Sequence, residues 1–310
     1  MNALWSIAEI ERDTGLGKDA LRVWERRYGF PQPVRDGRGD RLYDQPQFER
    51  LMLIKRLLDA GHRPGQIVPL PAPTLHTLLQ ASHPEPERPQ SQAGGLPGWR
   101  ELLEQGSPTE LRARLRQGVQ RLGLARAIEA WLAPLGRDIG AAWLAGELTM
   151  HQEHLFSEAV QAVLRAAIAA QESDADADAG RPRVLLATLA QEQHQIGLLM
   201  AECHFALERC ERITLGANLP LAEILASAAR YRADIVALSI SAHAAPREVN
   251  ESLRLLREQL PATVELWVGG GGIESGRRRL PASVRRVGRA EQISAELTRW
   301  RQSRPADARP

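Results

Sequence analysis

The sequence predicts a multidomain chain of α and α/β class, in which two helical blocks precede one α/β block. Residues 1–75 combine short amphipathic helices with a glycine hairpin, and residues 99–171 have helical periodicity with almost no strand signal. Residues 181–303 alternate β-branched or Leu-rich runs with amphipathic stretches, which is the pattern of a parallel sheet. Polar segments at 76–98 and 172–180 are predicted to be linkers between the blocks.

The bulk composition excludes several classes of protein. With 310 residues, 43% of them hydrophobic, the chain can form more than one core, and no run approaches the ~18–20 apolar residues of a membrane span. The net charge of +2 gives no overall field that favours nucleic acid. The start of the chain lacks the pattern of a secretory signal, so we expect a cytoplasmic protein with no membrane partner. Cys203 and Cys210 form neither a metal nor a disulfide framework and are expected to be reduced.

The first block is predicted to contain two short helices, a hairpin and a longer helix. Ser6 is a suitable N-cap for the first helix, and the glycines between Val34 and Leu42 favour a tight turn. The predicted order is helix Ile7–Asp13, turn Thr14–Gly17, helix Lys18–Tyr28, hairpin tip Asp36–Asp40 and helix Gln45–Ala60. This order is that of a helix-turn-helix followed by a wing.

The run Leu21–Phe30 (LRVWERRYGF), followed by Arg41–Tyr43 (RLY), resembles the winged-helix head of MerR-family transcription regulators. The resemblance implies a double-stranded DNA operator as partner, with the second helix in the major groove. The implied contacts are Lys18, Asp19 and Arg22 at base edges, and Arg26, Arg27, Arg38, Arg41 and Tyr43 at phosphates. Asp40 stands where many members carry His, and Trp24 is predicted to be a core residue.

The second block is predicted to be a four-helix bundle. Its segments are Trp99–Gln105, Pro108–Leu122, Leu124–Ala145 and Thr149–Ala170, separated at Gly106, Gly123 and Gly146. Thr149 and Gln152 have the spacing of a capping box for the fourth helix.

The third block is predicted to be a flavodoxin-like, Rossmann-like domain. The predicted strands are Arg183–Leu189, Ile213–Ala217, Ile235–Ser241, Val264–Gly269 and Val284–Val287, and the predicted helices are Ile196–Glu208, Leu221–Arg230, Pro246–Glu258 and Glu291–Gln302. Ligands of such sheets bind where the strands end.

Three motifs follow three of these predicted strands. The loop Glu192–Gly197 (EQHQIG) is separated by 41 residues from Ser239–Ser241, and 27 further residues separate that segment from Gly269–Gly272. This spacing resembles the cobalamin-binding signature of corrinoid-binding Rossmann-like domains. The resemblance implies that His194 is the lower cobalt ligand, oriented by Glu192. It also implies that the nucleotide tail of the cofactor lies along Gly197, Ser239, Ser241, Gly269 and Gly270.

The bundle carries a second motif of this kind. Nine residues lie between Trp143 and Glu153-His154, which resembles the W-x9-E-H motif of light-sensing, adenosylcobalamin-dependent MerR-type regulators. In that subgroup, the Trp packs where the adenosyl group lies, and the Glu and His line the same chamber. Leu144 departs from the pattern, because well-studied members often carry a His directly after the Trp. His151 and His154 are possible substitutes.

The resemblance covers nearly the whole chain and implies a transcription repressor, not an enzyme. It implies that the adenosylcobalamin-bound protein forms a homo-oligomer, such as a tetramer, and binds its operator until light breaks the Co–C bond. A MerR-type regulator that responds to a corrinoid or a protein partner without light is one alternative. A corrinoid carrier subunit of a methyltransferase is another, but it needs no DNA-binding head.

Overall fold

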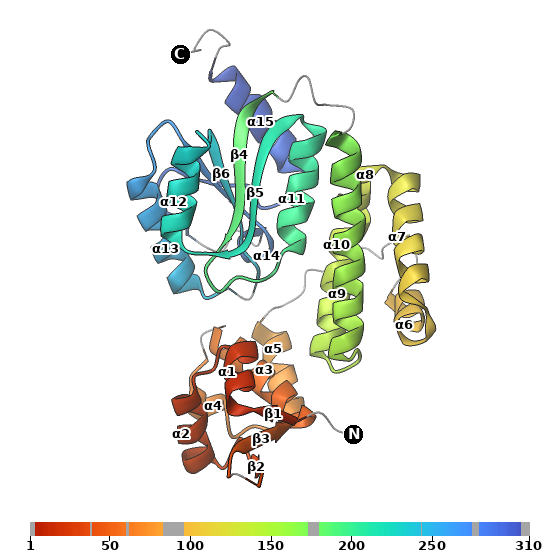
Figure 1. The fold of residues 1–310 in the computed structure, drawn as a ribbon, viewed down its shortest axis with the longest axis vertical. Coiled ribbons are helices and arrows are strands. Elements are labelled where there is room, and N and C mark those ends of the chain that lie inside the picture. Colours follow the sequence, from red (N-terminus) through yellow and green to blue (C-terminus); the bar gives the residue numbers. More distant parts are fainter. Residues whose placement is uncertain are drawn as a thin grey trace. The chain divides into compact units, whose positions relative to one another are not determined.

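A computed structural model describes residues 4–37, 39–59, 62–82, 96–172, 180–242, 244–274 and 279–304 (Figure 1). The chain divides into two compact units, Met1–Arg88 and Pro89–Pro310, and each is described by itself. In the described residues, no helix is both long enough and apolar enough to cross a bilayer.

The first unit is a small head of helices around a three-stranded antiparallel sheet of order β1-β3-β2. Its elements are β1 Leu4–Ser6, α1 Ile7–Thr14, α2 Lys18–Tyr28, β2 Val34–Arg35, β3 Arg41–Asp44, α3 Gln45–Asp59, α4 Pro64–Ile67 and α5 Ala72–Ser82. The predicted helices and hairpin are confirmed. The sequence did not predict β1, which pairs with β3 and joins the wing to the start of α1.

Side-chain hydrogen bonds hold the starts of both helices of the helix-turn-helix. Ser6 and Glu9 form a capping box at the start of α1, with the Ser6 hydroxyl accepting from the Glu9 backbone N–H at 3.3 Å. Gly15 ends α1 with φ +71°, a conformation that favours glycine. The Glu11 carboxylate then accepts from the Lys18 backbone N–H at 3.0 Å, so the first helix holds the start of the second.

The predicted linker 76–98 is wrong at both of its ends. Helix α5 runs through Ala72–Ser82 and packs against α3, with Leu75 fully buried. Proline is tolerated in the first turn of a helix, and the Pro71 carbonyl accepts from the Leu75 backbone N–H, so the proline-rich start did not prevent helix formation. The next helix already begins at Leu96, and residues 83–95 lie outside the described residues.

The second unit begins with the helical bundle: α6 Leu96–Gln105, α7 Pro108–Leu122, α8 Leu124–Ala127, η1 Ile128–Leu132, α9 Ala133–Leu144 and α10 Met150–Glu172. The segment predicted as one helix from Leu124 to Ala145 contains η1, a turn of π-helix. The Trp131 ring of this turn fills the space beside Gly118, where an added Cβ would lie 2.1 Å from the ring. At the start of α10, the Gln152 side chain accepts from the Thr149 backbone N–H at 2.7 Å, which is one of the two bonds of the predicted capping box.

The α/β part is a parallel five-stranded sheet of order β5-β4-β6-β7-β8, as predicted for a flavodoxin-like domain. Its elements are β4 Gly180–Leu189, α11 Ile196–Leu207, β5 Cys210–Leu219, α12 Leu221–Arg230, β6 Ile235–Ser239, α13 Pro246–Gln259, β7 Glu265–Gly269, α14 Gly271–Glu274, β8 Val284–Arg286 and α15 Gln292–Gln302. Helices α11 and α15 cover one face of the sheet, and α12 and α13 cover the other. Residues 173–179 of the second predicted linker lie outside the described residues.

Helix α11 joins the bundle to the sheet. Leu199, Met200 and Cys203 pack in the bundle core, whereas Leu198 and Phe205 pack against the sheet. Both cysteines are buried and free, as expected. Since one helix serves two cores, a change at its amino end affects both layers. That amino end lies directly after the loop that carries His194.

Candidate functional site

The three motifs of the α/β part lie together at the carboxyl edge of the sheet. They follow β4, β6 and β7, which are neighbours in the sheet order. The backbone N–H of Ile240 donates to the Gly269 carbonyl at 2.9 Å, and that of Gly272 donates to the Ile240 carbonyl at 3.0 Å. The loops after β6 and β7 are therefore bonded to each other.

Glu192 connects the His194 loop to this pair. One carboxylate oxygen lies 2.6 Å from Nδ1 of His194 and also accepts from the His194 backbone N–H at 3.0 Å. The other oxygen accepts from the Ser241 backbone N–H at 3.0 Å. Glu192 is buried, whereas the His194 side chain is 62% exposed. A carboxylate at Nδ1 favours the tautomer whose lone pair is on Nε2, the form of imidazole that binds a metal.

The same contacts keep Glu192 ionised. Burial by itself raises the pKa of this carboxyl group, but the hydrogen bonds from His194 and Ser241 outweigh burial and lower the pKa from 4.5 to about 2. The folded state therefore binds this proton more weakly than the unfolded chain does. The resulting stabilisation is complete above pH 4.5 and is lost as the pH falls towards 2.

Replacing Glu192 by Gln should remove this part of the acid sensitivity. At ~1.36 kcal/mol per pKa unit, ionised Glu192 contributes of the order of 2–3 kcal/mol at pH 6. Urea unfolding of wild type and Glu192→Gln between pH 6 and pH 2.5 measures this contribution. The stability difference between the two proteins should shrink as the pH falls. A constant difference across this range would show that the Glu192 carboxylate is not held by these bonds.

Glycines let the loops approach one another. An added Cβ on Gly197 would lie 2.9 Å from the Ser239 hydroxyl, one on Gly270 would lie 2.6 Å from the Ile240 carbonyl oxygen, and one on Gly272 would lie 2.4 Å from that of Ser241. Gly270 also has φ +94°. The edge is thus a cradle of bare backbone beside an exposed imidazole, and it fits a large cofactor that needs one nitrogen ligand.

Sequence reasoning missed two residues that hold the His194 loop. The buried Thr188 hydroxyl donates to the Glu192 carbonyl at 2.5 Å and accepts from the Asn218 backbone N–H at 2.9 Å. The Asn218 side chain accepts from the Gln191 backbone N–H at 2.8 Å. The available signal was a single hydroxyl in an otherwise apolar strand, Val184–Leu189, because a buried polar group needs a partner.

The bundle motif lies on α9 and α10, whose connecting turn extends past the carboxyl edge of the sheet (Figure 1). Trp143 is half-buried against the bundle core near the end of α9. In the first turn of α10, Glu153 lies 2.6 Å from Nδ1 of His154, whose side chain is 66% exposed. Further along α10, Arg165 donates to Gln195 beside His194 at 3.1 Å. His154 and Arg165 are eleven positions apart on this helix, or about 16 Å along its axis.

A contact between the two layers lies at the same edge. Arg137 of α9 lies 3.8 Å from Glu274 of α14, and Arg289 lies 3.2 Å from the same carboxylate. Helix α9, which carries Trp143, is therefore linked to the glycine loop. The bundle therefore contacts this edge at two points, through α9 beside the glycine loop and through α10 beside His194.

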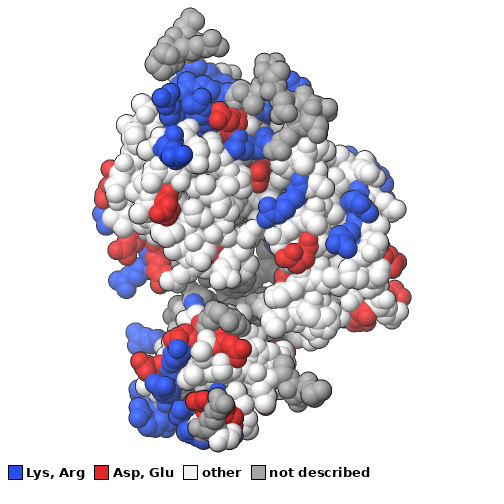
Figure 2. Space-filling view, viewed as in Figure 1, with Lys and Arg blue, Asp and Glu red and all other residues white. Residues whose placement is uncertain are grey.

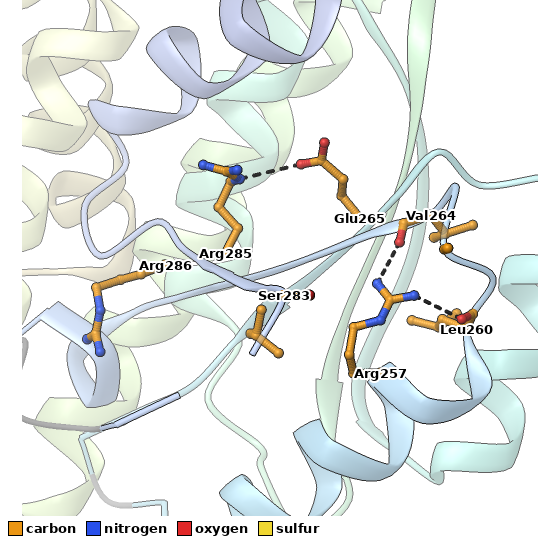
Figure 3. A pocket seen from close by; sticks show the side chains of 9 residues that line it. Arg257, Leu260, Val264, Glu265, Ser283, Arg285 and Arg286 are labelled. Carbon is orange, nitrogen blue, oxygen red and sulfur yellow. Dashed lines mark hydrogen bonds and ion pairs between the residues drawn. The ribbon is translucent and has the colours of Figure 1, made fainter. Parts of the chain in front are cut away.

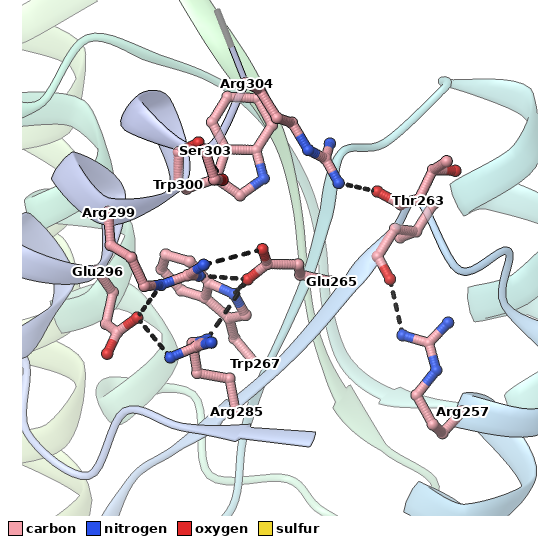
Figure 4. Close-up of polar contacts among 11 residues, drawn as sticks. Arg257, Thr263, Glu265, Trp267, Arg285, Glu296, Arg299, Trp300, Ser303 and Arg304 are labelled. Atoms are coloured by element: carbon pink, nitrogen blue, oxygen red, sulfur yellow. Dashed lines mark hydrogen bonds and ion pairs between the residues drawn. The ribbon is translucent and has the colours of Figure 1, made fainter. Parts of the chain in front are cut away.

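A hollow of about 740 Å³ lies at the opposite edge, near the starts of β7 and β8 (Figure 3). Its arginines already hold the fold together. Arg257 donates to the carbonyls of Leu260, Pro261 and Val264. Arg285 and Arg299 both contact Glu265 and Glu296, and Trp267 donates to Glu265 at 2.8 Å (Figure 4). We therefore assign this hollow a structural role.

In the head, the outer face of α2 is polar and largely cationic (Figure 2). Asp19, Arg22, Arg26 and Arg27 are exposed, whereas Leu21 and Trp24 are buried, which confirms the predicted core role of Trp24. Arg22 pairs with Asp19 at 3.3 Å, and Lys18 pairs with Glu11 at 3.0 Å. The three residues predicted at base edges thus lie at or near the start of one helix.

Of the predicted phosphate contacts, that of Tyr43 is wrong and that of Arg41 stays a prediction. Tyr43 is fully buried, because it points into the core from β3, so it cannot reach DNA in this fold. Arg41 is bonded to Glu25 of α2 at 2.8 Å, and this bond raises the pKa of the guanidinium. Arg41 therefore attaches the wing to the recognition helix. Arg38 lies outside the described residues.

Models of known families match all three blocks. Residues 5–70 match the MerR HTH family regulatory protein model, and residues 98–168 and 182–298 each match a B12 binding domain model. The first match covers the head, and the other two cover the bundle and the sheet.

Individual relatives extend over most of the chain. The HTH-type transcriptional repressor CarA of Myxococcus xanthus is 31% identical over 98% of this chain and 99% of its own. CarH of the same organism, also named an HTH-type transcriptional repressor, is 30% identical over 84% of this chain and 87% of its own. Among solved structures, a Methanosarcina barkeri monomethylamine corrinoid protein gives a TM-score of 0.49 at 16% identity, over 66% of this chain and 96% of its own.

Proposed function

The chain belongs to the MerR-type transcriptional regulators that carry B12-binding domains, and we propose that it senses adenosylcobalamin and, through that cofactor, light. The observation that carries the proposal is His194, exposed at the carboxyl edge of the sheet with Nδ1 held by buried Glu192. A buried carboxylate orients this exposed histidine, and such an orientation is typical of histidines that bind a metal.

The residues of the α/β part would hold the cofactor. Nε2 of His194 would bind the cobalt from below, and the nucleotide tail would lie along Gly197, Ser239, Ser241, Gly269 and Gly270, where the glycines let the loops pack closely. When bound, adenosylcobalamin supplies a Co–C bond that light breaks. Thr188 and Asn218 keep the histidine loop in place, so that the ligand position is fixed before binding.

The bundle would respond to whether the adenosyl group is present on the upper face of the corrin. We propose that Trp143, Glu153 and His154 line the space above the corrin, so that the adenosyl group is part of their packing. The Arg137–Glu274 contact links α9 to the glycine loop, so a shift of α9 would also move the glycine loop. Because Leu144 replaces the histidine of other members, His151 and His154 are the residues nearby that could bind cobalt after light.

DNA binding belongs to the head and assembly to the second unit. We propose a head at 1–75, a bundle at 99–171 and a cobalamin domain at 181–303, with α5 of the former linker added to the head. The adenosylcobalamin-bound chain would form a homo-oligomer, in the simplest case a tetramer, that binds a repeated operator. Linking several heads raises their effective concentration at neighbouring half-sites.

The arginines of α2 should differ in what they read. Arg22→Ala is expected to weaken operator binding by about 1–3 kcal/mol and to relax the preference for one base, because the proposed docking places Arg22 at a base edge. Arg27→Ala, which removes a proposed phosphate contact, should weaken binding to all sequences alike and reduce the salt slope by about one. Binding titrations at several salt concentrations separate the two effects. Equal loss of base preference in both variants would contradict the docking.

The proposed sensor is tested by oligomer size. Wild type with adenosylcobalamin should elute as an oligomer in darkness and as a smaller species after green light, measured by size-exclusion chromatography with light scattering. Trp143→Ala should bind the cofactor but assemble poorly, because the packing above the corrin is reduced. Hydroxocobalamin, which lacks the adenosyl group, is the matched control and should not support assembly. One mass for wild type in every state would exclude control by light.

One observation favours a related function, which is regulation without light. Leu144 removes the histidine that other members place beside the Trp, which fits a regulator that responds to a corrinoid or a protein partner without light. The same chromatography separates the two, because such a regulator would assemble with hydroxocobalamin as well. The DNA-binding head argues against a methyltransferase carrier.

A further inference from the structure

Val23 lies at the centre of the outer face of α2 and is 41% exposed. Asp19, Arg26 and Arg27 are its neighbours at the i−4, i+3 and i+4 positions, and all three are exposed. Residues at these spacings share one face of a helix. Val23 is therefore an apolar side chain in the middle of a charged surface.

Neither packing nor helix propensity accounts for a valine at this position. The inner face of α2 is filled by Leu21 and Trp24, and Val23 points away from them. A β-branched residue is a poorer helix former than Arg, Glu or Ala, since its side chain loses rotamer freedom against the preceding turn. Single exposed apolar residues are common, so position is the deciding feature. This one occupies the centre of the face that we propose enters the major groove.

The groove offers one apolar partner. Among the base edges in the major groove, only thymine presents a methyl group, and short apolar side chains contact it. The side chains of Arg22, Arg26 and Arg27 are longer than that of Val23 and can reach outward past it. Docking that brings those arginines to base edges and phosphates also brings the helix backbone close enough for a short side chain to touch a base.

We propose that Val23 contacts the 5-methyl group of a thymine and so specifies a T·A pair in each half-site of the operator. The inference rests on the DNA docking proposed above and adds a base preference to it. The contact is a burial of two apolar groups, so it discriminates without a hydrogen bond.

The test uses the full chain with adenosylcobalamin in darkness. A preferred duplex is first selected from a random pool, and each thymine is then replaced singly by deoxyuridine, which removes only the methyl group. Wild-type affinity should fall about fourfold at one thymine in each half-site, the factor that corresponds to about 0.8 kcal/mol for one buried CH₂-sized group. Val23→Ala should bind the thymine duplex more weakly and should no longer distinguish thymine from deoxyuridine there.

Val34→Ala is the matched control. Val34 is an exposed valine of the same head, 56% accessible, but it lies on β2 of the wing. This variant should keep the full wild-type discrimination at the critical thymine. The inference is overturned if wild type discriminates at no thymine, or if Val23→Ala keeps the wild-type ratio at that position. If selection enriches no duplex at all, both the proposed DNA docking and this inference are wrong. Sequence-specific binding without a methyl effect would overturn this inference but not the docking.

Discussion

Replacing His194 by Ala is expected to remove the lower cobalt ligand and to weaken adenosylcobalamin binding by at least 10–100-fold. That range is the usual loss when only an outer partner of a metal ligand is removed, and here the ligand itself is lost. The bound cofactor should also lose the absorbance shift that marks a nitrogen ligand from the protein. Equilibrium titration followed by absorbance in darkness measures both quantities.

The control for this variant is His62→Ala, the same substitution in the head, which should leave affinity and spectrum unchanged. Glu192→Gln should fall between wild type and His194→Ala, because its amide can no longer hold Nδ1 as a charged acceptor. Wild-type affinity and spectrum in His194→Ala would show that another group binds the cofactor.

Gly270→Ala is expected to lower both folding stability and cofactor affinity, for a steric reason. Its Cβ would lie 2.6 Å from the Ile240 carbonyl oxygen, at a backbone φ of +94° that an alanine rarely adopts. The loops after β6 and β7 must then separate, at a cost of roughly 1–3 kcal/mol in folding stability. Since the same loops would line the cofactor's tail, binding should fall at least tenfold.

Urea unfolding and cofactor titration of Gly270→Ala should be compared with those of Gly136→Ala. Gly136 lies within α9 and has open space where its Cβ would be, so that substitution should be neutral or stabilise by roughly 0.5–1 kcal/mol. Equal stability and equal affinity in both variants would mean that the glycine loop is not a close-packed cradle.

Elements with a clear period were predictable from sequence. Helices α2, α7 and α12 have the predicted bounds, and all five strands of the larger sheet lie within a few residues of their predicted places. The order of motif pieces along the chain also placed them at one edge, because all strands of a parallel sheet end on the same side. The family resemblance then supplied the proposed roles of His194 and Trp143, which periodicity could not.

Features that depend on tertiary contacts were not predictable. Four residues of β3 do not reveal which side faces the core, and Tyr43 was therefore assigned to DNA although it is buried. The π-turn around Trp131 depends on the space beside Gly118 of α7, and these two segments become neighbours only in the folded protein. The Thr188–Asn218 bond joins residues 30 apart in sequence, and neither has a periodic signal.

The central claim is that cobalamin bound at His194 controls DNA binding by the head. Its most direct test is the affinity of the full chain for its selected duplex, without cofactor, with adenosylcobalamin in darkness, and after green light, alongside His194→Ala in the same three states. We expect tight binding only for wild type with adenosylcobalamin in darkness, and weak binding in the other five samples. Equal affinity of wild type in all three states, or a His194→Ala variant that responds as wild type does, would contradict the claim.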